Sequence, residues 1–262
     1  MQTSQLLTRV EDHVGWIVLS NPTKLNAISF GMLSALADAF RAFDSDPAVR
    51  VIAIAGDGDR AFASGADISE FEERRSAAEA RDEYERVATE MASALLRTVK
   101  PTVAVIKGIC FGGGLGLAAN CDMRIARDDA KFCVPAARLG LGYRYSGVER
   151  LVTIVGPALA AEMLTTARRY TAAQAESMRL VNHAVEASEF DGFVAEFLGA
   201  IGANAPLTVA AATRGVREAT RAVAERDLAA VEQMVEACFR SGDYREGRAA
   251  FAEKRPPNFQ GR

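Results

Sequence analysis

The chain has 262 residues, of which 49% are apolar and 25% charged, a composition that suits one large hydrophobic core. The net charge of −3 at pH 7 excludes a strongly basic surface for nucleic acid or for an anionic membrane. The first residues lack the apolar run of a signal peptide. A lysine and five glycines interrupt the most apolar stretch, residues 103–119, so we expect no membrane helix and a cytoplasmic location.

The cysteines and histidines fit no metal-binding pattern. The spacing of the four cysteines matches neither a zinc motif nor a CxxC motif, and the two histidines, His13 and His183, lie far apart. We therefore expect no metal site and two structural histidines. We expect the cysteines to be small buried side chains in a reducing compartment, at Cys110, Cys121, Cys133 and Cys238.

Strand patterns alternate with helical patterns in the first part of the chain. Apolar, partly β-branched segments predict strands at residues 14–19, 49–55, 101–106 and 123–126. Ser29 is the expected N-cap of a helix over 30–43, which Asp46-Pro47 would end. A second helix is predicted over 81–99, with one apolar face formed by Val87, Met91, Leu95 and Leu96. This alternation predicts an α/β core.

From about residue 158 the chain is expected to be mainly helical. The predicted helices cover residues 159–166, 172–178, 189–201, 206–221 and 222–241. Such helices would form a second layer that packs on the core or on another subunit.

A cluster of glycines follows the strand predicted at 101–106 and precedes a helix-like run at 117–120. A dinucleotide-binding fingerprint fails because its sixth position is Leu117, and a phosphate loop fails because no Gly-Lys-Ser/Thr follows. Two interpretations stay open: backbone N–H groups at a helix N-terminus that bind a developing oxyanion, or a tight turn that permits close packing.

A second small-residue loop favours the first interpretation. Residues 61–71 also follow a strand, through the turn at 56–60, and enter a helix at Asp67 or Ser69. Two loops at strand ends could together supply two N–H donors to one oxygen.

These segments resemble the enoyl-CoA hydratase/isomerase (crotonase) family. Each motif alone is weak, but the set occurs in family order across nearly the whole chain. The matching segments are Asn21–Ile28, Phe62–Ile68, Lys100-Pro101, Gly108–Gly114, Cys121-Asp122, Ala130–Phe132, Leu139-Gly140, Ala175–Asn182 and Asp243–Arg255.

The resemblance implies a crotonase-type spiral of ββα repeats over residues 1–200 and a helical trimerisation region over 201–262. It implies a homotrimer or hexamer, an acyl-CoA substrate, and no cofactor beyond the coenzyme A of that substrate. The N–H groups of Ala66 and Gly113 would bind the thioester oxygen. Coenzyme A would contact Lys24, Ser64, Ala66, Asp67 and Ile68, with Phe251 and Lys254, from a neighbouring subunit, at the nucleotide end.

Both glutamates that perform acid and base catalysis in family hydratases are replaced here. Their positions, which lie 20 residues apart, hold Gly116 and Ala136, and no glutamate occurs between Glu90 and Glu149. Because glycine and alanine cannot transfer a proton, we do not expect hydration by the two-glutamate route. The acid in the Cys121-Asp122 pair is expected to be structural.

The segment after Leu139-Gly140 carries Tyr143, Arg144 and Tyr145 where family hydratases have a Pro-Gly-rich turn. It is similar to the methylmalonyl-CoA decarboxylase branch, which has a tyrosine at the position of Tyr143. That branch, however, has a glutamate at position 116 and a histidine at position 66. The ending at residues 257–261 is also similar to that branch.

A decarboxylase needs an oxyanion hole, a group that holds the substrate carboxylate, and a proton source. Arg144 could hold the carboxylate and Tyr143 could donate the proton. Alternatively, Tyr143 and Tyr145 only fill a pocket and Arg144 is a surface charge. The sequence therefore favours an acyl-CoA lyase or isomerase, with decarboxylation as one lyase reaction. A non-catalytic acyl-CoA-binding protein and a weak enoyl-CoA hydratase/isomerase are the alternatives.

Overall fold

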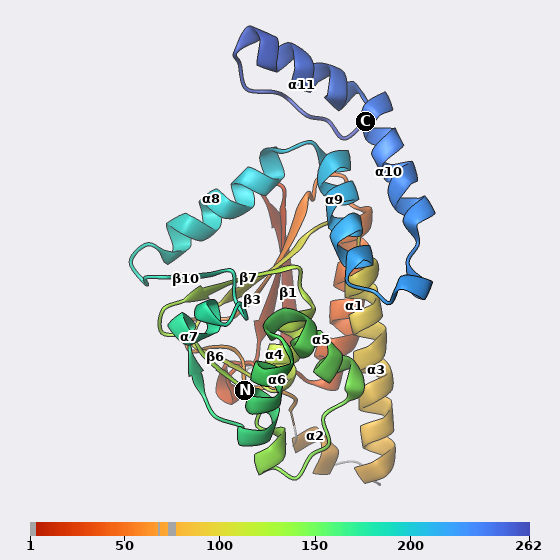
Figure 1. Ribbon diagram of the computed structural model, residues 1–262. Helices are drawn as coiled ribbons and strands as arrows, with labels where there is room; N and C mark the ends of the chain where they lie inside the picture. Colours follow the sequence, from red (N-terminus) through yellow and green to blue (C-terminus); the bar gives the residue numbers. More distant parts are fainter. Residues whose placement is uncertain (1–3, 68, 73–76) are drawn as a thin grey trace.

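The computed structural model describes residues 4–67, 69–72 and 77–262, and they form two sheets enclosed by helices (Figure 1). The larger sheet has the strand order β1-β2-β3-β5-β7-β10, and the smaller has the order β4-β6-β8-β9. The larger sheet consists of β1 (Gln5–Glu11), β2 (Val14–Ser20), β3 (Val51–Gly56), β5 (Thr102–Ile106), β7 (Met123–Arg127) and β10 (His183–Val185). The smaller consists of β4 (Ala61–Ala63), β6 (Ile109–Phe111), β8 (Lys131–Cys133) and β9 (Tyr170–Thr171).

Successive turns of the chain place one strand in each sheet and then a helix. β3 and β4 lead to α2 (Ser69–Glu72) and α3 (Ala77–Arg97), and β5 and β6 lead to α4 (Gly113–Asn120). β7 and β8 are followed by α5 (Tyr145–Val155) and α6 (Pro157–Thr166). Strands β2, β3, β5, β7 and β10 pair in parallel, as do β4, β6 and β8. The predicted spiral of ββα repeats is therefore confirmed.

Helices cover both faces of the larger sheet. On one face, α1 (Phe30–Ser45) and α3 pack with the smaller sheet around a core that includes Leu36, Phe40, Phe62 and Phe132. The other face is covered by α8 (Phe190–Ala203), which buries Phe190, Val194 and Leu198 against it. Side chains along a strand point alternately to the two faces of the sheet, and here both faces are covered by apolar layers. The central strands of the larger sheet are therefore apolar throughout.

The remaining helices are α7 (Ala172–Ser177), α9 (Pro206–Ala219), α10 (Leu228–Arg240) and α11 (Gly242–Glu253). Helices α10 and α11 project beyond the sheets in Figure 1. In the described part of the chain, no single helix is long and apolar enough to cross a membrane. Among the described helices, one pair, α8 and α9, bent by 105° between them, reaches the necessary length and composition together.

Several predicted boundaries are confirmed and others need correction. The Ser29 hydroxyl caps α1 by accepting a hydrogen bond from the N–H of Met32, and α1 ends before Asp46. The helix predicted over 222–241 is wrong in its first turn, because a short 3-10 turn at Val223–Glu225 precedes α10, which Asp227 caps. Leu96 does not share the buried face of α3, since it is 47% exposed.

Candidate active site

The two predicted loops lie against each other at the N-terminus of α4. An ideal Cβ built on Gly113 lies 3.3 Å from the backbone nitrogen of Ala66, and one built on Gly65 lies 3.7 Å from the nitrogen of Gly113. Gly113 is the first residue of α4, so its N–H has no acceptor inside that helix. The residue is also exposed to solvent. Two loops far apart in the sequence thus bring two backbone donors to one accessible position.

The backbone conformation of both loops explains their glycines. Gly65 and Gly112 have φ angles of +127° and +50°, in the region that glycine adopts most readily. A side chain at Gly114 would lie 2.6 Å from the carbonyl oxygen of Ala63, so only glycine permits this contact between α4 and β4. The loop of Ala66 is held by Ile28, whose N–H donates to Gly65 and whose carbonyl accepts from Asp67.

Four of the residues expected to bind coenzyme A, Lys24, Ser64, Ala66 and Asp67, form one cluster at these loops. The Lys24 ammonium contacts Asp67 at 2.8 Å and the Ser69 hydroxyl at 2.7 Å. The Ser64 hydroxyl donates to the carbonyl oxygen of Lys24 at 2.9 Å. Ile68, also expected here, lies outside the described residues.

Asp67 is the anion that holds Lys24 in this cluster. Its burial raises the pKa of the carboxyl group, but hydrogen bonds from Lys24 and Ser69 outweigh burial and leave the pKa below its ordinary value. The carboxylate is therefore ionised at neutral pH and keeps the Lys24 ammonium beside the Ala66 loop.

Phe251 and Lys254 lie far from this cluster within the same chain. Both belong to the end of α11, which is at the opposite end of the molecule from α2 (Figure 1). Phe251 is 87% exposed, and Lys254 is the left-handed C-cap of the helix. The chain does not bring these two residues to its own Ala66 loop.

Of the two positions where the resemblance places a glutamate, Gly116 borders a tyrosine. An ideal Cβ on Gly116 would lie 3.9 Å from the hydroxyl oxygen of Tyr143, whose ring packs on Gly147. Ala136 begins a 3-10 turn and packs against the same core. Burial raises the pKa of Tyr143, and the nearby Cys110 thiol raises it further, so the hydroxyl is protonated at neutral pH.

Arg144 is not a solitary surface charge. Its Nε donates to Oε1 of Glu85 at 2.9 Å, and its guanidinium also contacts the second carboxylate oxygen. Glu85 belongs to α3, so this pair joins α3 to the segment that precedes α5. A substrate carboxylate that bound Arg144 would have to exchange with Glu85.

Tyr84 is a site residue that the sequence analysis missed. Its hydroxyl oxygen lies 3.6 Å from an ideal Cβ on Gly113, and its ring packs edge-on against Phe30 with centroids 5.3 Å apart. The sequence did indicate that Tyr84 faces the core, because it lies three residues before Val87 and seven before Met91, on the same face of the helix. No motif distinguished it from an ordinary core residue.

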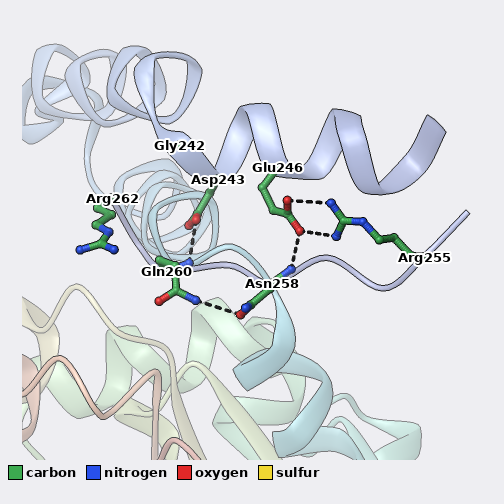
Figure 2. A pocket seen from close by; sticks show the side chains of 7 residues that line it. All are labelled: Gly242, Asp243, Glu246, Arg255, Asn258, Gln260 and Arg262. Carbon is green, nitrogen blue, oxygen red and sulfur yellow. Dashed lines mark hydrogen bonds and ion pairs between the residues drawn. The ribbon is translucent and has the colours of Figure 1, made fainter. Parts of the chain in front are cut away.

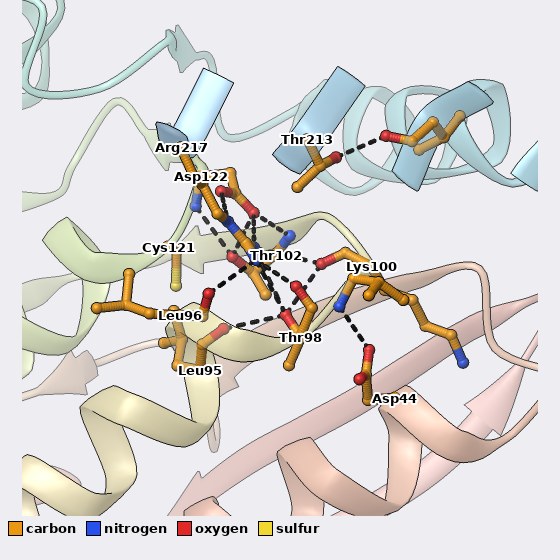
Figure 3. Close-up of polar contacts among 12 residues, drawn as sticks. Asp44, Leu95, Leu96, Thr98, Lys100, Thr102, Cys121, Asp122, Thr213 and Arg217 are labelled. Carbon is orange, nitrogen blue, oxygen red and sulfur yellow. Dashed lines mark hydrogen bonds and ion pairs between the residues drawn. The ribbon is translucent and has the colours of Figure 1, made fainter. Parts of the chain in front are cut away.

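Asp122 has the structural role that was expected (Figure 3). Its carboxylate accepts hydrogen bonds from the N–H and the hydroxyl of Thr102, both at 2.8 Å. It also forms an ion pair with Arg217 of α9, at 2.6 Å. The Arg217 guanidinium also donates to the carbonyl oxygens of Leu96 and Thr98. This network fastens α9 to the sheet and lies outside the candidate site.

An open hollow of about 640 Å³ lies between α11 and the last residues of the chain (Figure 2). Its acidic groups are already paired: Asp243 accepts from the N–H groups of Gln260 and Gly261, and Glu246 binds Arg255 and the N–H of Asn258. These bonds hold the C-terminal segment on α11, and we therefore assign no substrate to the hollow.

The histidines and cysteines lie away from the two donor loops or are buried. His13 bonds the carbonyl of Ala48, and His183 packs on two phenylalanine rings. Among the cysteines, only Cys238 is partly exposed. Among residues 4–67, 69–72 and 77–262, no three His, Cys, Asp or Glu side chains form a group that could hold a metal ion.

Comparison with known proteins agrees with this geometry. A crotonyl-CoA hydratase of Syntrophomonas wolfei is 33% identical over 259 residues, covering 99% of both chains. A carnitinyl-CoA dehydratase of Proteus mirabilis is 35% identical over 255 residues, covering 94% of each. The solved structure of an enoyl-CoA hydratase/carnithine racemase from Magnetospirillum magneticum superposes with a TM-score of 0.90 at 32% identity, covering 100% of this chain and 97% of the other.

The fold and the paired loops thus define a protein of the crotonase type. The family model for enoyl-CoA hydratase/isomerase matches residues 9–262. The chain belongs to the enoyl-CoA hydratase/isomerase family, an enzyme family that acts on acyl-CoA thioesters.

Proposed function

We propose that the protein is an acyl-CoA lyase that decarboxylates a malonyl-type CoA thioester. The observation that carries this proposal is the Tyr143 hydroxyl 3.9 Å from the Cβ position of Gly116, in the helix α4 whose first residue, Gly113, supplies one of the two backbone donors. A phenol in place of a glutamate can donate a proton but is a poor base at neutral pH. Decarboxylation generates its own carbanion and therefore needs a donor rather than a base.

In the proposed reaction, the bond between the α-carbon and the substrate carboxylate breaks and carbon dioxide leaves. The electron pair passes into the thioester as an enolate, whose oxygen accepts hydrogen bonds from Ala66 and Gly113. The α-carbon then takes a proton from the Tyr143 hydroxyl, which recovers one from water. Arg144 would hold the substrate carboxylate before the bond breaks, in exchange for Glu85.

Coenzyme A would lie along Lys24, Ser64, Ala66, Asp67 and Ile68. Support for this placement comes from the cluster that the described members form beside the Ala66 loop. Phe251 and Lys254 would complete the site of a neighbouring subunit, since they lie at the end of α11, which is at the opposite end of their own chain from α2 (Figure 1). We propose a homotrimer or hexamer on this basis. We also propose that the protein acts in the cytoplasm and needs no cofactor besides the coenzyme A of the substrate.

Exposed apolar side chains on the last three helices support such an assembly. They include Val216, Phe239 and Phe251, which are 66%, 58% and 87% exposed.

The test is a panel of CoA thioesters with the wild type and two tyrosine variants. We expect carbon dioxide release from malonyl-CoA or methylmalonyl-CoA, and a loss of about 10²- to 10⁴-fold in kcat for Tyr143→Phe. Tyr145→Phe is the matched control, because Tyr145 is 76% exposed and should keep full activity.

Other outcomes would replace the proposal. Acyl-CoA binding in calorimetry without any turnover would identify a non-catalytic binding protein. Hydration of crotonyl-CoA well above background would favour the hydratase activity after which several relatives are named.

A further inference from the structure

The hydroxyl of Tyr84 shares a position with the two backbone donors of the active site. The Cβ position of Gly113, which the glycine leaves open, lies 3.3 Å from the Ala66 nitrogen and 3.6 Å from the Tyr84 hydroxyl oxygen. Tyr84 comes from α3, whereas the other two groups come from the loops before α2 and at the start of α4. Three elements thus bring a nitrogen or oxygen that can donate a hydrogen bond close to one point.

The ring of Tyr84 is fixed in this orientation. It packs edge-on against Phe30, at an interplanar angle of 86°. Phe30 begins α1 and is buried, and its backbone N–H donates to the Glu70 carboxylate at 2.8 Å, so the residue that supports the Tyr84 ring is itself held in place. A hydroxyl on a fixed ring is suited to hold one acceptor in place, because little freedom is lost when the acceptor binds.

We propose that Tyr84 is a third donor to the thioester oxygen, in addition to the N–H groups of Ala66 and Gly113. This inference rests on the proposed acyl-CoA site but not on the reaction that follows. A phenol can donate to an oxygen that gains negative charge, and a fixed donor helps most when that charge is largest.

The protonation state of Tyr84 agrees with a donor. Burial, with a smaller contribution from the nearby Glu70 carboxylate, raises the pKa of its hydroxyl to about 12. The group therefore stays neutral, and keeps its proton, at every pH at which the protein would act.

The direct readout is the carbonyl stretch of acetyl-CoA labelled with ¹³C at the thioester carbon, measured by difference infrared spectroscopy on the bound complex. Hydrogen bonds to the oxygen lower this frequency. We expect binding to lower it in the wild type, and Tyr84→Phe to reverse part of the shift while acyl-CoA still binds. Tyr145→Phe, the exposed control, should leave the frequency unchanged. An unchanged frequency in Tyr84→Phe would overturn the inference.

A second variant covers the case in which Tyr84→Phe does not fold or bind. Difluorotyrosine at position 84 keeps the ring and the hydroxyl but makes it a stronger donor, so the frequency should fall further than in the wild type. No change with bound acetyl-CoA would count against Tyr84.

Kinetics give an independent measure. For whichever thioester turns over, removing one donor to a charged oxygen should lower kcat about 10- to 100-fold and change KM less. Because acetyl-CoA carries no carboxylate, the infrared result is informative even if no carbon dioxide is released. Failure of the proposed decarboxylation is therefore distinguishable from failure of the Tyr84 assignment.

Discussion

The substitution Gly113→Ala tests the paired donor loops directly. The new methyl group would lie 3.3 Å from the Ala66 nitrogen, closer than ordinary van der Waals contact, and it would occupy the space beside both N–H groups. It would meet the Tyr84 hydroxyl at 3.6 Å as well. The loops must separate by a few tenths of an ångström, and an acyl oxygen can no longer reach both donors.

Loss of one such donor raises the barrier by about 3 kcal/mol, which corresponds to a fall in kcat of about 10²- to 10³-fold. The contact is confined to a loop edge and Gly113 has no left-handed φ angle, so we expect the thermal midpoint to change little. The assay is the rate on the best thioester of the panel, with binding followed by calorimetry and folding by circular dichroism.

Gly199→Ala is the matched control. It is the same substitution in a helix, α8, and the added methyl meets nothing within 4 Å. We expect unchanged turnover and a gain in stability of about 0.5–1 kcal/mol, since alanine favours helix more than glycine does. Normal turnover by Gly113→Ala would refute the assignment of the oxyanion hole.

Three further predictions concern other parts of the molecule. Arg217→Ala should lower the free energy of unfolding by about 2–3 kcal/mol in urea titration, because the partly buried Asp122 loses its ion pair and keeps only the hydrogen bonds from Thr102. Arg240→Ala, at an exposed pair, should change it by less than about 0.5 kcal/mol. Gly116→Glu with Ala136→Glu should raise crotonyl-CoA hydration above the wild-type rate, and no rise would mean either that these are not the glutamate positions or that the pocket around them has been rebuilt. In the folded state the pKa of Tyr84 is about 12, whereas an unfolded tyrosine ionises near pH 10. The free energy of unfolding should therefore fall as the pH rises between these two values, and it should fall less steeply in Tyr84→Phe.

Four strands of the larger sheet, β2, β3, β5 and β7, and the first helices were predictable because their patterns are local. The two edge strands were not predicted: the side chains of β1 are mostly exposed, and β10 is only three residues long. Strands such as β3 and β5 are continuous apolar runs, and Ser29 and Asp46 mark the ends of α1 with ordinary capping chemistry. The smaller sheet was not predicted, because its strands are two or three residues long and are fixed by pairing between distant segments. α11 was also missed, although Ser241 caps it.

The candidate site also contains residues that the sequence predicts and residues that it does not. The glycines of the two loops and the residues at positions 116 and 136 can be found from motif and register alone. Tyr84 and Glu85 cannot, because their relation to Gly113 and Arg144 arises only when α3 packs across the start of α4 and the segment before α5. A helix pattern shows which face is buried, but it does not show what that face meets.

The most direct test of the account is a crystal structure with a non-reacting acyl-CoA bound. We predict that the thioester oxygen lies about 2.7–3.1 Å from the backbone nitrogens of both Ala66 and Gly113, with the Tyr143 hydroxyl as the side-chain group nearest the α-carbon. An acyl group bound elsewhere, or a carboxylate side chain at the α-carbon in place of Tyr143, would contradict it.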